Sequence, residues 1–130
     1  MRRYGTIPWM MRAGRLRIVL VQSKDRDRWV LPKGRAKKGM SKRALAALET
    51  WEEAGARGEF FGGAPVDVTV DRSKGRVRLR LYPMHVSVLK KRYPERDARQ
   101  RQVVSPKRAI ALLTDPGMRR AVQKLARRLT

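Results

Sequence analysis

Short apolar stretches separated by turn residues dominate the first third of the chain, and this pattern predicts β-strands. Tyr4–Met11 is one predicted strand, and Leu16–Gln22 is a second one that is richer in β-branched residues. Residues 13–14, Ala-Gly, suit a hairpin turn between the two. A charged loop over residues 23–28 then leads to the apolar segment Trp29–Leu31. We therefore expect a β-hairpin at the start of the chain.

From Ser41 the pattern changes to that of a helix. Ser41 is a favoured N-cap residue, strong helix formers follow it, and Gly55 is placed to end the helix. The apolar side of this predicted helix consists of Ala44, Leu45, Ala47, Leu48 and Trp51.

Strands return after the helix. Glu59–Phe61 and Val66–Val70 are predicted to be short strands, and residues 73–75 a turn. Arg76–Leu89 is predicted to be a long strand, because apolar and arginine residues alternate at its start. This period of two is typical of a strand with one buried and one solvated face.

The last part of the chain combines a loop, a brief strand and two helices. We expect a polar loop over Lys90–Arg101 and a strand at Gln102–Val104. Residues 105–106, Ser-Pro, and 115–116, Asp-Pro, each open a predicted helix. The second of these helices carries an apolar stripe of Met118, Val122, Leu125 and Leu129. The expected fold class is α/β or α+β, a mixed β-sheet with helices in one domain over residues 1–130.

The composition narrows the possible chemistry. The 130 residues contain 33 Lys and Arg against 11 Asp and Glu, a net charge of +22. Such a charge attracts phosphate-rich partners and makes non-specific nucleic-acid binding expected at low salt. The chain has no cysteine, which excludes thiolate sites, and a single histidine, His85, which excludes a multi-histidine zinc site. No segment has the apolar run of a signal peptide or a membrane span, so we expect a cytoplasmic protein.

Three of the acidic residues lie within five positions of the predicted helix, namely Glu49, Glu52 and Glu53. At about 100° per residue they share an arc of roughly 100°, where like charges repel by a few tenths of a kcal/mol per pair. Among the positions four residues away, only Arg57 offers a cation. A solvated acidic face is the usual explanation of such a cluster. The glycine-bearing loop before this helix favours a second explanation, in which the carboxylates bind Mg²⁺ or Mn²⁺ that also contacts the phosphates of a ligand.

Residues 29–58, WVLPKGRAKKGMSKRALAALETWEEAGARG, resemble the signature of the Nudix hydrolases. This Nudix box has the pattern G-x5-E-x7-R-E-U-x-E-E-x-G-U, with U a bulky apolar residue. The segments WVLPKG and WEEAG are similar to the diphosphoinositol polyphosphate phosphohydrolase branch and its bacterial relatives. The resemblance implies the Nudix fold, a mixed β-sheet sandwiched between helices. The matching residues are Gly34 for the first glycine, Glu49 for the glutamate of R-E, Glu52 and Glu53 for the E-E pair, and Gly55 for the last glycine.

Four positions depart from the box. Met40 stands where the family has Glu, Leu48 where it has Arg, and the two U positions hold Thr50 and Ala56. In the family, that Glu and that Arg brace the loop to the helix. We expect Met40 to pack on Leu48 as a hydrophobic brace, because the loss of one ionic partner alone would leave an unpaired charge. The alternative is relaxed selection on catalysis and a weak site.

The resemblance implies a Mg²⁺-dependent (or Mn²⁺-dependent) hydrolase that cleaves a pyrophosphate linkage in a highly phosphorylated substrate. Diphosphoinositol polyphosphates and dinucleoside polyphosphates are the expected substrates. The resemblance makes Glu49 and Glu53 metal ligands, together with the backbone carbonyl of Gly34, and makes Glu52 the catalytic base. Family members differ in which carboxylate acts as the base, so the assignment among the three stays open.

Cationic and polar residues on the surrounding loops are expected to bind the substrate, since arginine pairs well with phosphate. Glu95 and Asp97 are candidates for a further acid. The expected substrate-binding residues are Arg2, Arg3, Ser23, Lys24, Lys33, Arg35, Arg99 and Arg101.

A second interpretation keeps the fold without the turnover. The protein would then be a weakly active or inactive Nudix-fold protein that binds RNA or polyphosphate, and the residues that favour this are Met40 and Leu48. The sequence leaves both interpretations open, and also the exact substrate, the number of metal ions and the oligomeric state.

Overall fold

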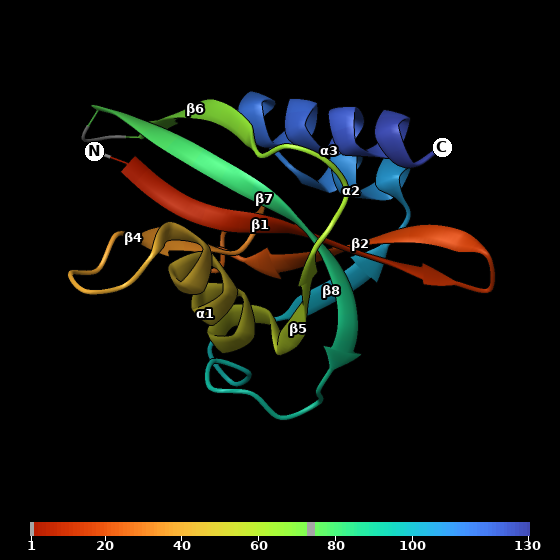
Figure 1. Ribbon diagram of the computed structural model, residues 1–130, viewed down its shortest axis with the longest axis horizontal. Coiled ribbons are helices and arrows are strands. Elements are labelled where there is room, and N and C mark those ends of the chain that lie inside the picture. The colour runs from red at the N-terminus through yellow and green to blue at the C-terminus, as the bar shows by residue number, and fades with distance from the viewer. Residues whose placement is uncertain (1, 73–74) are drawn as a thin grey trace.

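One mixed sheet of eight strands forms the centre of the structure (Figure 1). The computed structural model describes residues 2–72 and 75–130, so the predicted turn at residues 73–75 falls mostly outside the described residues. Helix α1 (Lys42–Ala54) lies on one side of the sheet, and helices α2 (Pro106–Leu112) and α3 (Pro116–Leu129) lie on the other. This arrangement confirms the predicted mixed sheet between helices. No described helix combines the length and the apolar content that a membrane crossing needs.

Strand β1 (Arg2–Arg12) is the central strand. It runs parallel to β7 (Gly75–Leu89), and the other strand pairs are antiparallel. Near its two ends β1 also pairs with β4 and with β2, so that it joins all parts of the sheet. The remaining strands are β2 (Arg15–Gln22), β3 (Trp29–Val30), β4 (Lys33–Arg35), β5 (Ala56–Phe60), β6 (Val66–Arg72) and β8 (Arg101–Val104).

The predicted hairpin and helices are confirmed, and β4 and β5 differ most from the predicted strands. Ala13 and Gly14 both adopt positive φ angles, 49° and 74°, as a tight hairpin turn requires. β4 was not predicted, because three residues after a proline become a strand only through their pairing with β1. β5 begins at Ala56 rather than at Glu59, because Ala56 already pairs with Leu89 at the end of β7.

The main core lies between the sheet and helices α2 and α3, and a smaller cluster lies under α1. Met118, Val122 and Leu125 of the predicted stripe are buried in the main core, and Leu129 packs at its edge. The smaller cluster contains Tyr4, Leu45, Ala46 and Tyr82.

A buried polar contact also fixes α1 to the sheet. The hydroxyl of Thr50 donates to the carbonyl of Ala46 at 2.7 Å, so the hydroxyl of Thr6 on β1 is the donor in the 2.7 Å contact between the two threonines. Both side chains are fully buried. Thr50 stands at one of the bulky apolar positions of the box, and this contact explains why a threonine fits there.

We expect Thr50→Val to lower the free energy of unfolding by about 1–3 kcal/mol, because it leaves the buried Thr6 hydroxyl without an acceptor. The double variant Thr6→Val/Thr50→Val should lose less than the sum of the single variants, since both polar groups are then gone. Urea unfolding of the four proteins measures the coupling. Strictly additive losses would show that the two hydroxyls do not interact.

Candidate active site

Helix α1 is held in a fixed register by both of its ends. The Ser41 side chain accepts a hydrogen bond from the N–H of Ala44 at 3.1 Å. At the other end Gly55 adopts φ 65°, and its N–H donates to the carbonyl of Trp51 at 2.9 Å. A side chain at Gly55 would also collide with the ring of Tyr93. These caps set the direction in which the three glutamates of the helix point.

The loop between β7 and β8 packs onto the C-terminal end of α1. The N–H of Glu95 donates to the carbonyl of Glu52, and the N–H of Lys90 donates to the carbonyl of Gly55, both at 2.9 Å. Helix ends leave such carbonyls without a partner inside the helix. The loop supplies the missing donors, and it is thereby positioned beside the acidic face.

Arg101 takes part in this packing. Its guanidinium donates to the carbonyl of Ala54 at 2.6 Å and to that of Lys90 at 2.7 Å. The same group lies over the Tyr93 ring, 5.0 Å from its centroid. Arg101, which the sequence suggested as a substrate-binding residue, therefore contacts the end of the helix in this structure.

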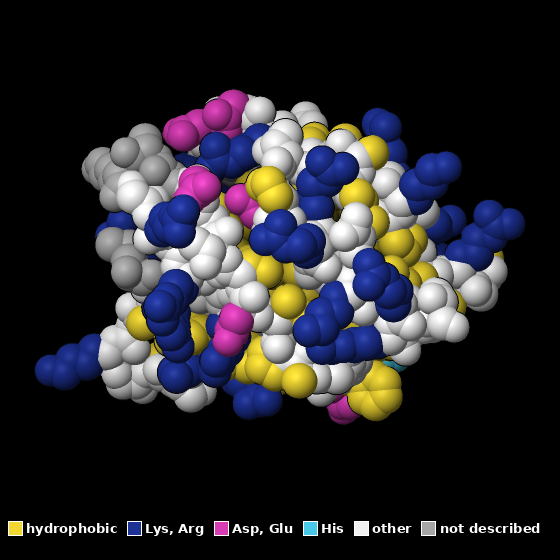
Figure 2. All heavy atoms as spheres, turned by 90° about the horizontal axis from the view of Figure 1, so that it is seen from above, with side chains coloured by type: hydrophobic (Ala, Val, Ile, Leu, Met, Phe, Trp, Pro, Cys, Tyr) yellow, Lys and Arg dark blue, Asp and Glu magenta, His cyan; other side chains and the backbone are white. Residues whose placement is uncertain are grey.

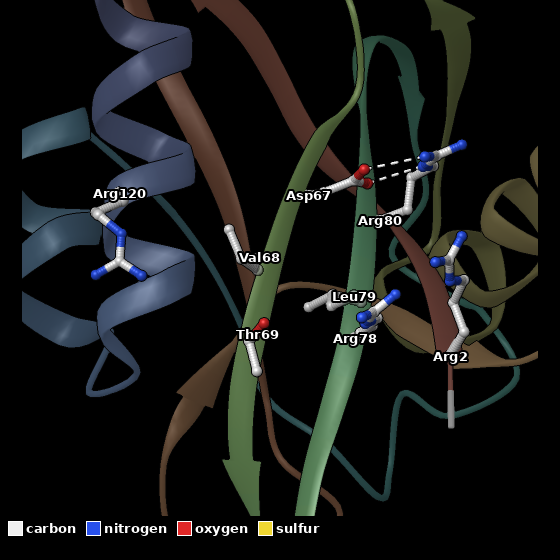
Figure 3. A pocket seen from close by; sticks show the side chains of 8 residues that line it. All are labelled: Arg2, Asp67, Val68, Thr69, Arg78, Leu79, Arg80 and Arg120. Atoms are coloured by element: carbon white, nitrogen blue, oxygen red, sulfur yellow. Dashed lines mark hydrogen bonds and ion pairs between the residues drawn. The ribbon is translucent and has the colours of Figure 1, made fainter.

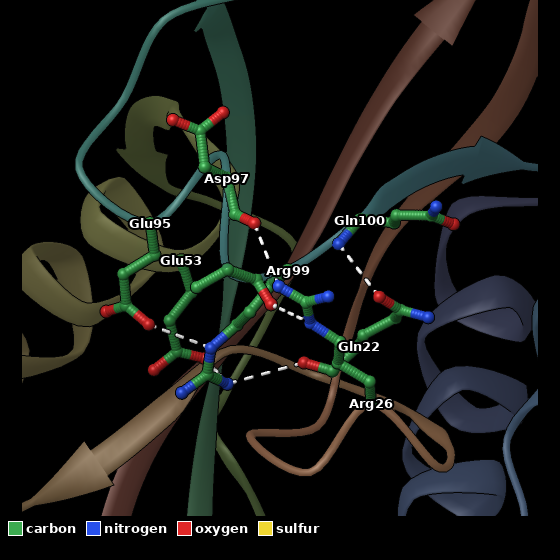
Figure 4. Close-up of polar contacts among 8 residues, drawn as sticks. Gln22, Arg26, Glu53, Glu95, Asp97, Arg99 and Gln100 are labelled. Carbon is green, nitrogen blue, oxygen red and sulfur yellow. Dashed lines mark hydrogen bonds and ion pairs between the residues drawn. The ribbon is translucent and has the colours of Figure 1, made fainter.

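Arg99 brings the loop and the acidic helix together (Figure 4). Its guanidinium pairs with the Glu53 carboxylate at 3.3 Å and with the Glu95 carboxylate at 2.8 Å. It also donates to the carbonyl of Gln22 at 3.3 Å. The acidic cluster is therefore compensated by a residue from a distant loop. Arg57, the only cation that the helix spacing offered, lies instead over the Trp51 ring at 3.9 Å.

The loop that follows β2 is hydrogen-bonded to the loop between β7 and β8. Arg26, at φ 59°, donates to the carbonyls of Ala98 and Asp97 at 2.8 and 3.0 Å. The N–H of Gln22 donates to the carbonyl of Gln100, and the N–H of Gln100 donates to the Gln22 side chain, both at 3.0 Å (Figure 4). Two loops that are far apart in the sequence thus form one wall of the site.

Glu53 is the most perturbed group of the cluster. Its side chain is 2% exposed. Burial raises the pKa of the Glu53 carboxyl to about 8, because a buried carboxylate loses its hydration; Arg99 and Lys33 oppose the shift, and Glu49 and Glu95 add to it. The Glu53 carboxyl therefore binds a proton more readily than a solvated glutamate does.

Glu49 lies beside Glu53 on the helix. Its pKa is raised, first by burial and then by the charge of Glu52, while a hydrogen bond with Glu53 and the charge of Lys37 lower it. The Lys37 ammonium is 3.8 Å from the Glu49 carboxylate. A methyl group at Gly34 would collide with that carboxylate, so the glycine is what lets the β4 backbone approach Glu49.

A strongly cationic cavity of about 470 Å³ adjoins Glu53. Arg99 both lines this cavity and pairs with Glu53. Arg3 and Lys33 also lie close enough to the Glu53 carboxylate for their charges to interact with it. Six of the eight lining residues are cations and one is acidic: Arg3, Lys24, Arg28, Lys33, Arg35 and Arg99, with Ser23 and Asp25 completing the lining.

Arg3 contributes an unpaired hydrogen-bond donor to the lining of the cavity. Its Nε–H is buried and has no hydrogen-bond acceptor among the described residues. Buried donors are nearly always paired, because an unpaired one costs about 1–3 kcal/mol. Burial and the neighbouring charge of Arg35 also lower the pKa of the Arg3 guanidinium. A phosphate oxygen in the cavity would satisfy the donor and offset the repulsion.

The cavity gathers most of the residues that the sequence suggested for substrate binding. Two of the suggested residues lie elsewhere, since Arg2 lines a different pocket and Arg101 contacts the helix end. Arg28 and Asp25 were missed, because nothing in a charged loop distinguishes a lining residue from a solvated one. The suggested residues that do line the cavity are Arg3, Ser23, Lys24, Lys33, Arg35 and Arg99.

The donor set fits a hard divalent cation at the Glu49–Glu53 pair. Two carboxyl groups close enough to share a hydrogen bond, both with a raised pKa, suit a cation whose charge would favour their ionised forms. Within residues 2–72 and 75–130, no group of three or more acidic or histidine side chains is arranged to hold a metal ion. The fit therefore rests on the pair and on the close backbone of Gly34.

The two apolar replacements in the box lie in different surroundings. Met40 is 39% exposed. Leu48 lines a shallow groove together with Trp51, Met84 and Ala47. The packing of Met40 on Leu48 stays a prediction.

No protein-family model and no curated protein sequence matches the chain. Solved structures do match it. The C. elegans Ap4A hydrolase has a TM-score of 0.77 at 19% identity, over 99% of this chain and 98% of that one. The NUDIX domain of Shewanella oneidensis NrtR, complexed with ADP ribose, has a TM-score of 0.74 at 11% identity, over 100% and 88%. The E. coli dihydroneopterin triphosphate pyrophosphohydrolase has a TM-score of 0.71 at 13% identity, over 95% and 92%. These likenesses confirm the predicted fold.

The raised pKa of Glu53 predicts a pH-dependent effect of Glu53→Gln on stability. Without metal, the unfolded chain releases the Glu53 proton near pH 4.5, whereas the folded protein holds it up to about pH 8. The contribution of Glu53 to stability therefore falls as the pH rises between these values. Relative to wild type, Glu53→Gln should gain about 1 kcal/mol or more between pH 5 and pH 8.

Urea unfolding in EDTA at the two pH values measures this gain, with Glu52→Gln as the control on the same helix. A difference between Glu53→Gln and wild type that stays constant with pH would contradict the assignment.

Proposed function

We propose that this protein, whose fold is that of the Nudix hydrolases, is a hydrolase that uses a divalent metal ion to cleave a pyrophosphate linkage. One observation carries the proposal: the buried Glu53 carboxyl and the half-buried Glu49 carboxyl beside it adjoin a cationic cavity lined by Arg3, whose Nε–H has no acceptor among the described residues. A cation at Glu49 and Glu53 would neutralise the two carboxylates. A phosphate in the cavity would accept the hydrogen bond from the Arg3 Nε–H.

The residues divide into three roles in this proposal. Glu49 and Glu53 hold the metal ion together with the carbonyl of Gly34, and Glu52, half-buried on the same helix, is the proposed base that accepts a proton from the attacking water. When bound, Mg²⁺ or Mn²⁺ supplies positive charge that neutralises the charge developing on the phosphate oxygens. Arg3 and Arg99 bind and orient the phosphates, because a guanidinium donates two parallel hydrogen bonds to one phosphate.

The lining of the cavity bears on the substrate. The eight residues described as lining it include six cations and no aromatic side chain. Recognition therefore rests on phosphates rather than on the stacking of a base. Among the expected substrates, this favours a diphosphoinositol polyphosphate over a dinucleoside polyphosphate such as the Ap4A named for one of the similar structures.

A panel of substrates tests the proposal. Purified protein is incubated with a diphosphoinositol polyphosphate, Ap4A or ADP ribose, in Mg²⁺, Mn²⁺ or EDTA, and the products are separated by anion-exchange chromatography. We expect metal-dependent cleavage of at least one substrate, and a loss of about 100-fold or more in Glu53→Gln, since a metal ligand is removed. Glu59→Gln, an exposed position on β5, is the matched control.

Each negative outcome has its own meaning. No metal-dependent cleavage of any substrate would overturn the hydrolase proposal and support the alternative of a weakly active or inactive binding protein. Cleavage that persists unchanged in Glu53→Gln would overturn the metal assignment.

A further inference from the structure

A second cationic pocket lies where β1, β6 and β7 run side by side (Figure 3). It has a volume of about 450 Å³. Arg2 lines this pocket, whereas Arg3, the next residue of β1, lines the cavity described above. Successive side chains of a strand point to opposite faces, so β1 separates the two sites. The lining residues of the second pocket are Arg2, Asp67, Val68, Thr69, Arg78, Leu79, Arg80 and Arg120.

The strand register places two arginines directly beside each other. Arg2 of β1 is the partner of Arg78 on β7, and Thr69 of the edge strand β6 is the partner of Arg78 on its other side. Like charges directly opposite each other in a sheet are destabilising. The row Arg2–Arg78–Thr69 therefore carries two cations and a hydroxyl but no acid of its own, although the charge of Asp67 in a neighbouring row acts on Arg2.

In two other rows of β6 and β7, an acid on β6 forms an ion pair with the arginine on β7. Asp67 on β6 pairs with Arg80 through two hydrogen bonds of 2.8 and 2.9 Å. Asp71, four residues further along β6, lies 3.4 Å from Arg76. On the face that carries these two acids, the position between them is Thr69, so the alternation of acids on β6 is broken at the row that holds Arg2 and Arg78.

The charge balance of the pocket is therefore positive. Arg2, Arg78 and Arg120 form no ion pair within the part of the chain that the structure describes, and all three are exposed. Arg120 reaches the pocket from α3, on the other side of β6 (Figure 3). Arg2 and Lys42, at the start of α1, are both near enough for their charges to act on Asp67, which is already paired with Arg80. Lys and Arg side chains are also spread over the face shown in Figure 2.

We propose that this pocket is a second anion site, separate from the cleavage site, and that it binds a linear chain of phosphates. Arg2 and Arg78 form one subsite, where two guanidinium groups and the Thr69 hydroxyl donate hydrogen bonds to the oxygens of one phosphate. Arg120 forms the next subsite across the edge strand. A ligand that contacts both must be elongated, which a phosphate chain is and a single phosphate is not.

A charge-matched pair of double variants tests the site. Arg78→Gln/Arg120→Gln removes two cations of the pocket, and Arg119→Gln/Arg127→Gln removes two exposed cations of α3 that do not line it. Both have the same net charge. Binding of a fluorescent single-stranded RNA with a 5′-hydroxyl, and its competition by inorganic polyphosphate or inorganic phosphate, is measured between 50 and 300 mM salt.

We expect the affinity of the pocket variant for RNA to fall about tenfold or more. The slope of its log K against the logarithm of the salt concentration should become shallower by about 1.4, or about 0.7 for each of two lost phosphate contacts. The control variant should change affinity less than about twofold. Polyphosphate should compete at a far lower concentration of phosphate groups than inorganic phosphate does. If the pocket variant loses RNA affinity but keeps its competition by polyphosphate, the site is assigned to the nucleic-acid backbone. If it keeps its RNA affinity but loses the competition by polyphosphate, the site is assigned to polyphosphate.

Equal losses in the two double variants would overturn the proposal, since binding would then follow net charge alone. RNA affinity and polyphosphate competition that are both unchanged in the two variants would overturn it as well. Thermal unfolding checks that both variants are folded. The assay uses an RNA without a pyrophosphate group and needs no metal, so its result is independent of whether the protein hydrolyses pyrophosphates.

Discussion

Glu53 is a carboxyl group buried on a helix of a protein with a net charge of +22, and the rest of the site is arranged around the need to compensate it. A buried carboxylate is costly unless it is paired or protonated. Arg99 supplies the partner, and it reaches Glu53 because the loop that carries it is hydrogen-bonded to the end of α1. The same Arg99 lines the cationic cavity, so the acidic pair and the cavity form one continuous site.

The distribution of acids decides where the positive charge of this protein is available to a ligand. On one face of β6 and β7, Asp67 forms an ion pair with Arg80, and Asp71 forms one with Arg76. In the cavity beside α1, Asp25 is the single acid among eight lining residues. Cations therefore outnumber acids on both sides of β1, with Arg3 on one side and Arg2 on the other.

The sequence predicted the parts of the fold that local chemistry determines. The helix from Ser41 to Gly55 was predictable because an N-cap serine and a glycine at the C-terminal end act within a few residues of the chain. β4 was not, because its strand character comes from its pairing with β1. The predicted metal ligands and base come from a local motif, and their roles stay predictions.

The side-chain contacts of the site depend on the tertiary structure more than the boundaries of helix α1 do. The Arg99–Glu53 pair joins residues 46 positions apart, and no helix spacing could reveal it. Arg101 belongs to the expected loop, yet its guanidinium contacts the carbonyls of Ala54 and Lys90. Resemblance to a family locates a loop, but the direction of each side chain depends on its packing.

A crystal structure with Mn²⁺ and a non-hydrolysable methylene bisphosphonate would test the account most directly, because Mn²⁺ is located by its anomalous signal. We expect Mn²⁺ between the carboxylates of Glu49 and Glu53, with a phosphonate oxygen accepting the hydrogen bond from the Nε–H of Arg3. Mn²⁺ bound away from both carboxylates, or a bisphosphonate outside the cavity with the Arg3 Nε–H still unpaired, would contradict it.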